Sequence, residues 1–230
     1  MSFKTKAFIA AAVCAASTAL AGGAVAQPAG PDNFALGAGI GTDGGEILAE
    51  YRLSDQLVLR GQGSFLDMSK GFNSSDVHYH GKLKSNLGGA FLDWHPGGGA
   101  FFLSGGVDAG QRRVDVSANP SASASISING TTYTATQIGS VYGRVKFADV
   151  SPVASLGWDT TFHSASPWGM RVQAGVLFGG RPKVNLAATG PFANDPTVQS
   201  NLRAEEASLR NDARDFRYYP IVSAALTYRF

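Results

Sequence analysis

Apolar and polar residues alternate along most of the chain, and the last segment shows the alternation most clearly. Positions of one parity there are aromatic, apolar or proline: Phe216, Tyr218, Pro220, Val222, Ala224, Leu226, Tyr228 and Phe230. The positions between them are mostly small or polar. A period of two predicts a β-strand with one apolar face. Its aromatics stand at both ends of that face, which is typical of the interfacial girdles of a membrane barrel, whereas a soluble sandwich keeps aromatics in mid-core.

The same alternation recurs and predicts eight strands. They cover residues 34–42, 45–53, 57–70, 78–94, 100–114, 142–163, 168–184 and 216–230. An even number of strands suits a closed barrel of this kind. The predicted fold class is therefore all-β: an eight-stranded antiparallel transmembrane β-barrel with short periplasmic turns, an extracellular β-ribbon and a short extracellular helix.

The connections alternate in length, which supports the barrel independently, because periplasmic turns stay short while outer loops grow. Short turns fall at 54–55, 96–99 and 164–167, and the tight first outer connection is an exception. In one long connection, Asn129-Gly130 between β-branched residues predicts a β-ribbon over 125–134. In the other, Asp195 followed by Pro196 predicts the start of a helix over 195–215.

The facing of the strand at 78–94 depends on which parity is chosen. The pattern favours an outward Leu83, Leu87, Gly89 and Phe91, which places Lys82 and Lys84 inside the barrel. This choice sends Asp93 outward, near the periplasmic interface, where a charge costs little. A β-bulge would reverse the assignment.

The N-terminal residues carry the pattern of an export signal. Lys4 and Lys6 precede an apolar run over 7–21, and Ala24-Val25-Ala26 has the form of a signal-peptidase site. We expect a signal peptide over 1–26, a periplasmic lead-in over 27–33 and the barrel over 34–230. The only cysteine, Cys14, falls within the signal, so the mature chain is expected to have no disulfide.

Composition excludes several classes of protein. Only 16% of the residues are charged and 44% are hydrophobic, which argues against disorder, and no one-sign charge run suggests nucleic-acid binding. After Gly22 no apolar stretch approaches the roughly 18 residues of a membrane-spanning helix. We expect a monomer without a nucleic-acid partner.

Charged residues of both signs fall on the inward parity. The candidates for a solute path are Glu46, Glu50, Arg60, Lys82, Lys84, Asp108, Arg112, Asp159 and Arg171. Because eight strands leave an interior just wide enough for side chains, these residues form either a salt-bridged plug or a narrow path for small polar solutes. A basic outer rim of Arg113, Arg144, Lys146, Arg181 and Lys183 is expected to pair with anionic groups of outer-membrane lipids and lipopolysaccharide, and attraction of anionic solutes is the alternative.

No catalytic signature stands out. His78 and His80 share one face of a strand, which is compatible with a metal site, and the nearby Ser74, Ser75 and Asp76 are compatible with an outer-leaflet lipid hydrolase. The third interpretation is that these are polar residues at a strand end. We expect the last of these, with no enzyme activity, no metal and no cofactor.

Several blocks resemble known barrels. Tyr228-Arg229-Phe230 resembles the assembly signal of Gram-negative outer-membrane proteins, which implies the barrel assembly machinery as a partner of Tyr228 and Phe230. The second half is similar to the CarO family, on the blocks at 128–133, 143–157, 179–184, 205–206 and 219–220. That resemblance implies an eight-stranded protein of the outer membrane of a Gram-negative bacterium, associated with uptake of ornithine, other small amino acids and some carbapenems.

Two functions follow from these expectations. The first is passive uptake of small polar solutes through a narrow charged lumen. The alternative is a closed structural or interaction barrel whose extracellular loops bind partners or lipopolysaccharide.

Overall fold

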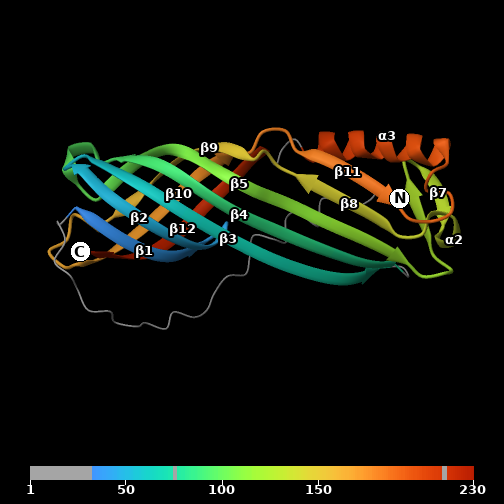
Figure 1. Ribbon diagram of the computed structural model, residues 1–230, viewed down its shortest axis with the longest axis horizontal. Helices are drawn as coiled ribbons and strands as arrows, with labels where there is room; N and C mark the ends of the chain where they lie inside the picture. The colour runs from blue at the N-terminus through green and yellow to red at the C-terminus, as the bar shows by residue number, and fades with distance from the viewer. Residues whose placement is uncertain (1–32, 75–76, 214–216) are drawn as a thin grey trace.

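Eight antiparallel strands close into a barrel in the computed structural model, which describes residues 33–74, 77–213 and 217–230 (Figure 1). The expected signal at 1–26 and all but the last residue of the lead-in lie outside these ranges. The ring comprises β1 (Phe34–Gly41), β2 (Gly44–Ser54), β3 (Leu57–Ser74), β4 (Val77–Trp94), β5 (Phe101–Pro120), β9 (Val150–Asp159), β10 (Trp168–Phe178) and β12 (Tyr218–Arg229). Each strand pairs with its neighbours in the ring, and the pairings β5–β9 and β1–β12 complete the circle. The predicted fold class is confirmed.

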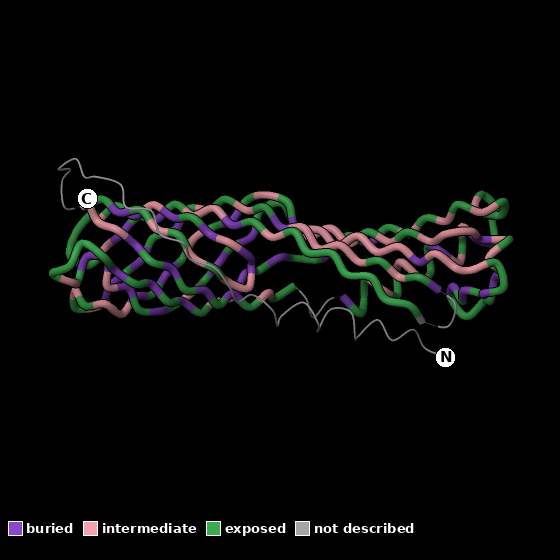
Figure 2. Tube along the Cα trace, turned by 90° about the horizontal axis from the view of Figure 1, so that it is seen from below, coloured by how far each residue is buried: buried purple, intermediate pink, exposed green. Residues whose placement is uncertain are grey.

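Side chains in the ring alternate between the interior and the outer surface. In β12, Ser223 and Thr227 are buried, whereas Val222 and Leu226 are about half exposed. Figure 2 shows the same alternation of buried and exposed residues along the barrel. The apolar residues therefore form an outward band, with exposed aromatics at the end with short turns (Trp94, Trp158, Trp168) and at the opposite end (Phe65, Phe178, Tyr218).

The predicted facing of β4 is wrong. Phe91 and Asp93 are buried, and Leu92 and Trp94 are exposed. No bulge intervenes, because β3 and β4 pair without a register shift from Leu57 opposite Trp94 onward. The inward parity is fixed by an ion pair between Asp93 and Arg60 inside the barrel, while Trp94 takes a place in the aromatic girdle.

Two predicted strands are each interrupted at the rim. The segment at 142–163 divides into β8 (Val141–Lys146) and β9, and the segment at 168–184 into β10 and β11 (Lys183–Ala188). The cause is a change of partner along β5, whose first half pairs with β9 and whose second half pairs with β8.

The long strands continue beyond the barrel as an open sheet. The parts of β3, β4 and β5 past the rim join β8 and β11 in the order β11-β8-β5-β4-β3, and Figure 1 shows this sheet projecting from one end of the barrel. We call it the extension. At the opposite end, a single 3-10 turn, η1 (Pro96–Gly98), connects β4 to β5.

A small cap covers the far part of the extension. It consists of β6 (Ser125–Ile128), β7 (Thr131–Thr134), α2 (Ala135–Ile138) and α3 (Pro196–Asp212). The predicted ribbon is confirmed, with Asn129 at φ 49° and Gly130 at φ 76° in its turn, as a type I′ hairpin requires. The predicted helix is confirmed too, and the Asp195 side chain accepts hydrogen bonds from the backbone of Thr197 and Val198.

The cap packs on one face of the extension only. Its buried residues Ile126, Ile138 and Leu202 belong to the same apolar cluster as Val77 of β4 and Ala118 of β5. These two strand residues share the parity that faces the barrel interior, so the cap covers the face that continues the lumen. Within the described ranges, neither helix combines the length and apolar content needed to cross a membrane.

Candidate functional site

Arg171 stands at the centre of a buried ion cluster in the barrel. Its Nη1 atom lies 3.0 Å from Glu50 Oε1 and 2.7 Å from Asp159 Oδ2, and its Nη2 atom lies 2.8 Å from Asp93 Oδ2. The four side chains come from β10, β2, β9 and β4, and none is more than 2% exposed. The guanidinium also lies 3.9 Å from the ring centroid of Phe102. One cation therefore ties four strands together across the lumen.

A second arginine extends this cluster. Arg60 Nε lies 3.0 Å from Asp93 Oδ2, and its guanidinium stacks 4.1 Å from the ring centroid of Phe91. Arg60 also donates to Gln62, whose amide in turn donates to Glu46 Oε2 at 2.8 Å. Asp93 is thus shared by two buried arginines, and polar contacts cross the lumen from wall to wall.

An apolar layer lies next to the ion cluster inside the barrel. Phe91, Val153, Leu177 and Ile221 are buried against one another, and Leu87 and Tyr219 pack on them. These side chains come from β4, β9, β10 and β12, and three of these strands also carry residues of the ion cluster, so the apolar layer and the cluster lie at different heights of the same strands. Side chains thus fill this part of the interior.

Arg112 occupies the mouth of the barrel that faces the extension. Its guanidinium lies between two rings, 4.7 Å from the centroid of Phe147 and 4.8 Å from that of Tyr219. The Tyr219 hydroxyl donates to the Thr42 carbonyl at 2.5 Å, which fixes this ring across the rim. The Arg112 side chain is buried, and its Nε and Nη1 atoms have no hydrogen-bond partner among the described residues.

Most of the predicted lumen residues lie inside the barrel. Glu46, Glu50, Arg60, Asp108, Arg112, Asp159 and Arg171 are all buried. The placement of Lys82 and Lys84 is wrong. Both lie on the extension, where each ammonium is 3.3 Å from a carboxylate oxygen of Asp67.

Sequence reasoning missed Asp93 and the apolar layer. The error about Asp93 follows from the wrong facing of β4. Trp94 carried a usable signal, because an aromatic at the end of a strand belongs on the outward girdle and so turns Asp93 inward. The apolar layer had no comparable signal, since its members come from four strands whose contacts only the register defines.

The predicted rim residues lie beyond the barrel, on or beside the extension. Arg144 forms an ion pair with Asp115 at 2.5 Å, and Lys146 forms one with Asp149 at 2.9 Å. Lys183 pairs with Lys146 in the sheet register, and Arg181 is exposed in the connection between β10 and β11. Their contact with lipid stays a prediction.

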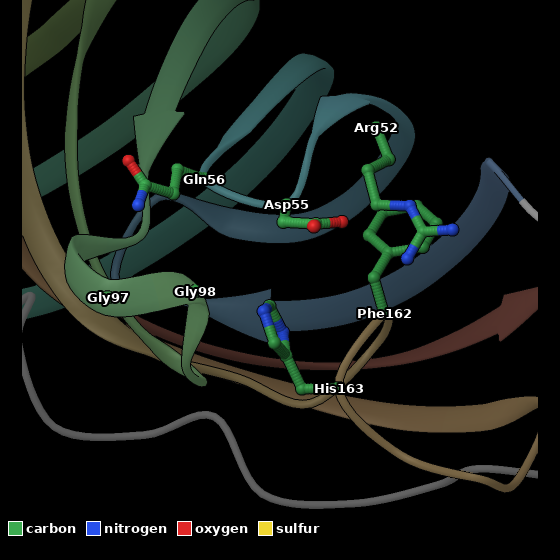
Figure 3. A pocket seen from close by; sticks show the side chains of 7 residues that line it. All are labelled: Arg52, Asp55, Gln56, Gly97, Gly98, Phe162 and His163. Carbon is green, nitrogen blue, oxygen red and sulfur yellow. The ribbon is translucent and has the colours of Figure 1, made fainter.

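A pocket of about 350 Å³ lies at the end of the barrel with short turns (Figure 3). The Arg52 guanidinium lies 5.4 Å from the centroid of Phe162, and Figure 3 shows His163 beside Gly98. The His163 ring is 4.8 Å from that of His95, although the two residues lie in different turns. Partial desolvation at the turn, reinforced by the neighbouring His95, lowers the pKa of the His163 imidazole.

The other two histidines lie far from this pocket. His78 Nδ1 is 2.6 Å from Asn73 Oδ1 in the extension. Among the described residues, no group of three or more His, Cys, Asp or Glu side chains could hold a metal ion.

The C-terminal aromatics join the girdle. Tyr228 contacts Trp168 at a centroid distance of 4.9 Å and Phe230 at 5.2 Å, and Phe230 lies 6.1 Å from Phe34. Their recognition by the assembly machinery stays a prediction.

Two solved structures share this architecture. CarO2 of Acinetobacter baumannii superimposes with a TM-score of 0.60 and 20% identity, covering 86% of this chain and 98% of its own. CarO of the same organism gives a TM-score of 0.58 and 17% identity, covering 85% and 97%. No family model and no curated protein matches the chain. At these identities the likeness establishes the fold, which agrees with the resemblance found in the sequence.

Proposed function

We propose that the protein is a closed barrel of a Gram-negative outer membrane that anchors the extension and its cap at the cell surface. The outward apolar band with aromatics at both ends supports a place in the membrane, because this is the surface that lipid requires. The short turns then face the periplasm and the extension faces outward. We expect a monomer, without catalytic activity or cofactor, assembled through Tyr228 and Phe230.

The observation that carries the closed lumen is the set of three ion pairs around Arg171. A solute passing this level has to separate Arg171 from buried carboxylates on β2, β4 and β9. Removing one partner of a buried ion pair typically costs about 3–5 kcal/mol, so such separation is rare at equilibrium. The apolar layer around Leu177 blocks the interior a second time.

One observation favours uptake as a second candidate. Buried polar atoms near the outer mouth, among them Arg112 Nε and Asp43 Oδ1, have no hydrogen-bond partner among the described residues. Such atoms are commonly satisfied by ordered water. A hydrated compartment beneath Arg112 would lead to a solute path if both arginines moved.

Conductance in planar bilayers separates the two candidates. A closed barrel gives no channel events for the wild type, nor for Met170→Ala, whose side chain faces outward next to Arg171. The triple variant Arg112→Ala, Arg171→Ala and Leu177→Ala removes both obstructing cations and opens the apolar layer, and it is expected to give small, flickering events.

Liposome swelling in glycine or ornithine provides the companion measurement. Swelling by the wild-type protein would overturn the closed lumen and support uptake. All proteins are first checked for the heat-dependent gel shift of a folded barrel, so that a misfolded sample is not scored as a closed one.

A further inference from the structure

Four basic residues stand side by side in one row of the extension. The strand register places Lys84 opposite Arg113, Arg113 opposite Lys146, and Lys146 opposite Lys183. Directly paired residues of an antiparallel sheet point to the same face, and neighbouring strands lie about 4.8 Å apart. The row therefore runs about 14 Å across β4, β5, β8 and β11. We call it the basic row.

The basic row lies on the face that continues the outer surface of the barrel. In β4, Lys84 shares the parity of the outward Leu92 and Trp94. The cap covers the opposite face, through Val77 and Ala118. Along β3, Asp67 is paired with Lys84 and stands two residues past Phe65, an outward aromatic at the end of the apolar band. The basic row thus follows directly on the surface proposed to contact lipid.

Positive charge exceeds negative charge around this row. The neighbouring row on the same face adds Lys82 and Arg144, which makes six basic side chains with the four above. The carboxylates paired with them are Asp67, Asp115 and Asp149. Like charges directly opposite each other destabilise a sheet, so an anion bound here would relieve a repulsion that the protein leaves in place.

The sheet surface beside the row is also hollowed. A cleft of about 600 Å³ is lined by Lys82, Tyr142, Arg144 and Asn185 and also by Asp115, whose carboxylate forms an ion pair with Arg144. Ammonium, guanidinium, phenol and amide groups all donate hydrogen bonds to phosphate oxygens.

We propose that the basic row and this cleft bind the phosphate groups of lipopolysaccharide in the outer leaflet. The proposal rests on the proposed membrane placement but not on the closed lumen. The occupant is identified by two features together. The excess charge calls for an anion of high charge density, and the position of the row directly past the apolar band places it at the height of lipid headgroups. The row is long enough to contact more than one phosphate.

The test compares two matched double variants of the full chain in detergent. Arg113→Gln with Lys146→Gln removes the middle of the basic row, and Arg203→Gln with Arg210→Gln removes two exposed bases of α3. Binding of purified lipopolysaccharide is titrated, together with enzymatically dephosphorylated lipopolysaccharide and inorganic phosphate as probes. We expect the row variant to bind native lipopolysaccharide at least about tenfold more weakly, since charge-assisted contacts are lost, and the α3 variant to bind as the wild type does.

Dephosphorylated lipopolysaccharide should bind the wild type about as weakly as the native lipid binds the row variant, and raising the salt concentration should weaken only native binding. Equal affinity of both double variants for native lipopolysaccharide overturns the proposal, as does undiminished binding of the dephosphorylated lipid. Tight binding of inorganic phosphate alone would reassign the row to a soluble anion. A conducting wild-type barrel would refute the closed lumen without changing any of these results.

Discussion

Arg171 is a charged side chain buried inside the barrel, where an unpaired charge would be strongly destabilising. Its guanidinium is almost fully buried, yet it contacts carboxylates on three other strands and the ring of Phe102. The sequence could predict that Arg171 faces inward, because parity alone decides that. It could not predict which carboxylates surround it, because Glu50, Asp93 and Asp159 are brought together only by the register of separate strand pairs.

Replacing this arginine should destabilise the barrel strongly. Arg171→Ala leaves three buried carboxylates without their shared cation, so we expect the free energy of unfolding to fall by about 3–5 kcal/mol. Urea unfolding in detergent, followed by tryptophan fluorescence, measures the change. Met170→Ala is the matched control, since Met170 is 54% exposed, and should cost less than about 1 kcal/mol. Equal losses in the two variants would contradict the structural role of the ion cluster.

His163 should make stability depend on pH. Because its pKa is lowered in the folded protein, the unfolded chain takes up the proton first as the pH falls, and stability is lost below the ordinary histidine range. Urea midpoints at pH 8 and pH 5.5 should therefore differ less in His163→Gln than in the wild type.

The control for this histidine is Ala165→Ser in the same turn, which changes no titratable group. It should keep the wild-type difference between the two pH values. A His163→Gln protein with an unchanged difference would show that other groups carry the pH dependence.

The strands past the rim show how a regular pattern can mislead. In β4 the apolar alternation runs through barrel and extension alike, so it gives the period but not the environment of each face. The interruptions after β8 and β10 arise because β5 changes its partner from β9 to β8 along its length. No local pattern in residues 142–163 predicts this change. By contrast, the Asn129-Gly130 turn and the Asp195 cap act over a few neighbouring residues, and both were predicted from sequence.

The start of α3 offers a test of such a local signal. Asp195→Ala removes the acceptor for the backbone N–H groups of Thr197 and Val198 and should lower the local stability of the helix by about 1 kcal/mol. The loss of helix stability is measured as faster hydrogen exchange of the α3 backbone amides. Asp212→Ala, at the opposite end, should leave exchange unchanged or slow it slightly, because an acid is unfavourable near a helix C-terminus. Faster exchange in both variants would mean that helix contacts, not the cap, were disturbed.

Closure of the ring depends on a close approach between β1 and β12. Gly39 pairs with Ala225, and a Cβ at Gly39 would stand 2.3 Å from the Ala224 carbonyl oxygen and 2.6 Å from the Ala225 Cβ. The sequence predicted the number of strands in the closed barrel, but it did not predict how closely the backbones of β1 and β12 approach each other.

Gly39→Val should therefore cost about 3 kcal/mol and reduce the fraction of chains that refold into a closed barrel. The heat-dependent gel shift after refolding into detergent quantifies that fraction. Gly61→Val is a matched control, because a Cβ at Gly61 meets nothing within 4 Å. A normal refolding yield for Gly39→Val would show that β1 and β12 can accommodate the larger side chain at little energetic cost.

β3 and β4 contain 18 residues each and pair with one another along their whole length, without a register shift at the rim. At about 3.3 Å per residue each extends for roughly 60 Å, more than twice the height of a barrel's apolar band. No interruption of this strand pairing provides a hinge, so the cap cannot move freely relative to the barrel. The paired strands hold it at a fixed distance and orientation from the barrel, so in the outward placement that we propose, antibodies or phages would meet it at a fixed height above the membrane.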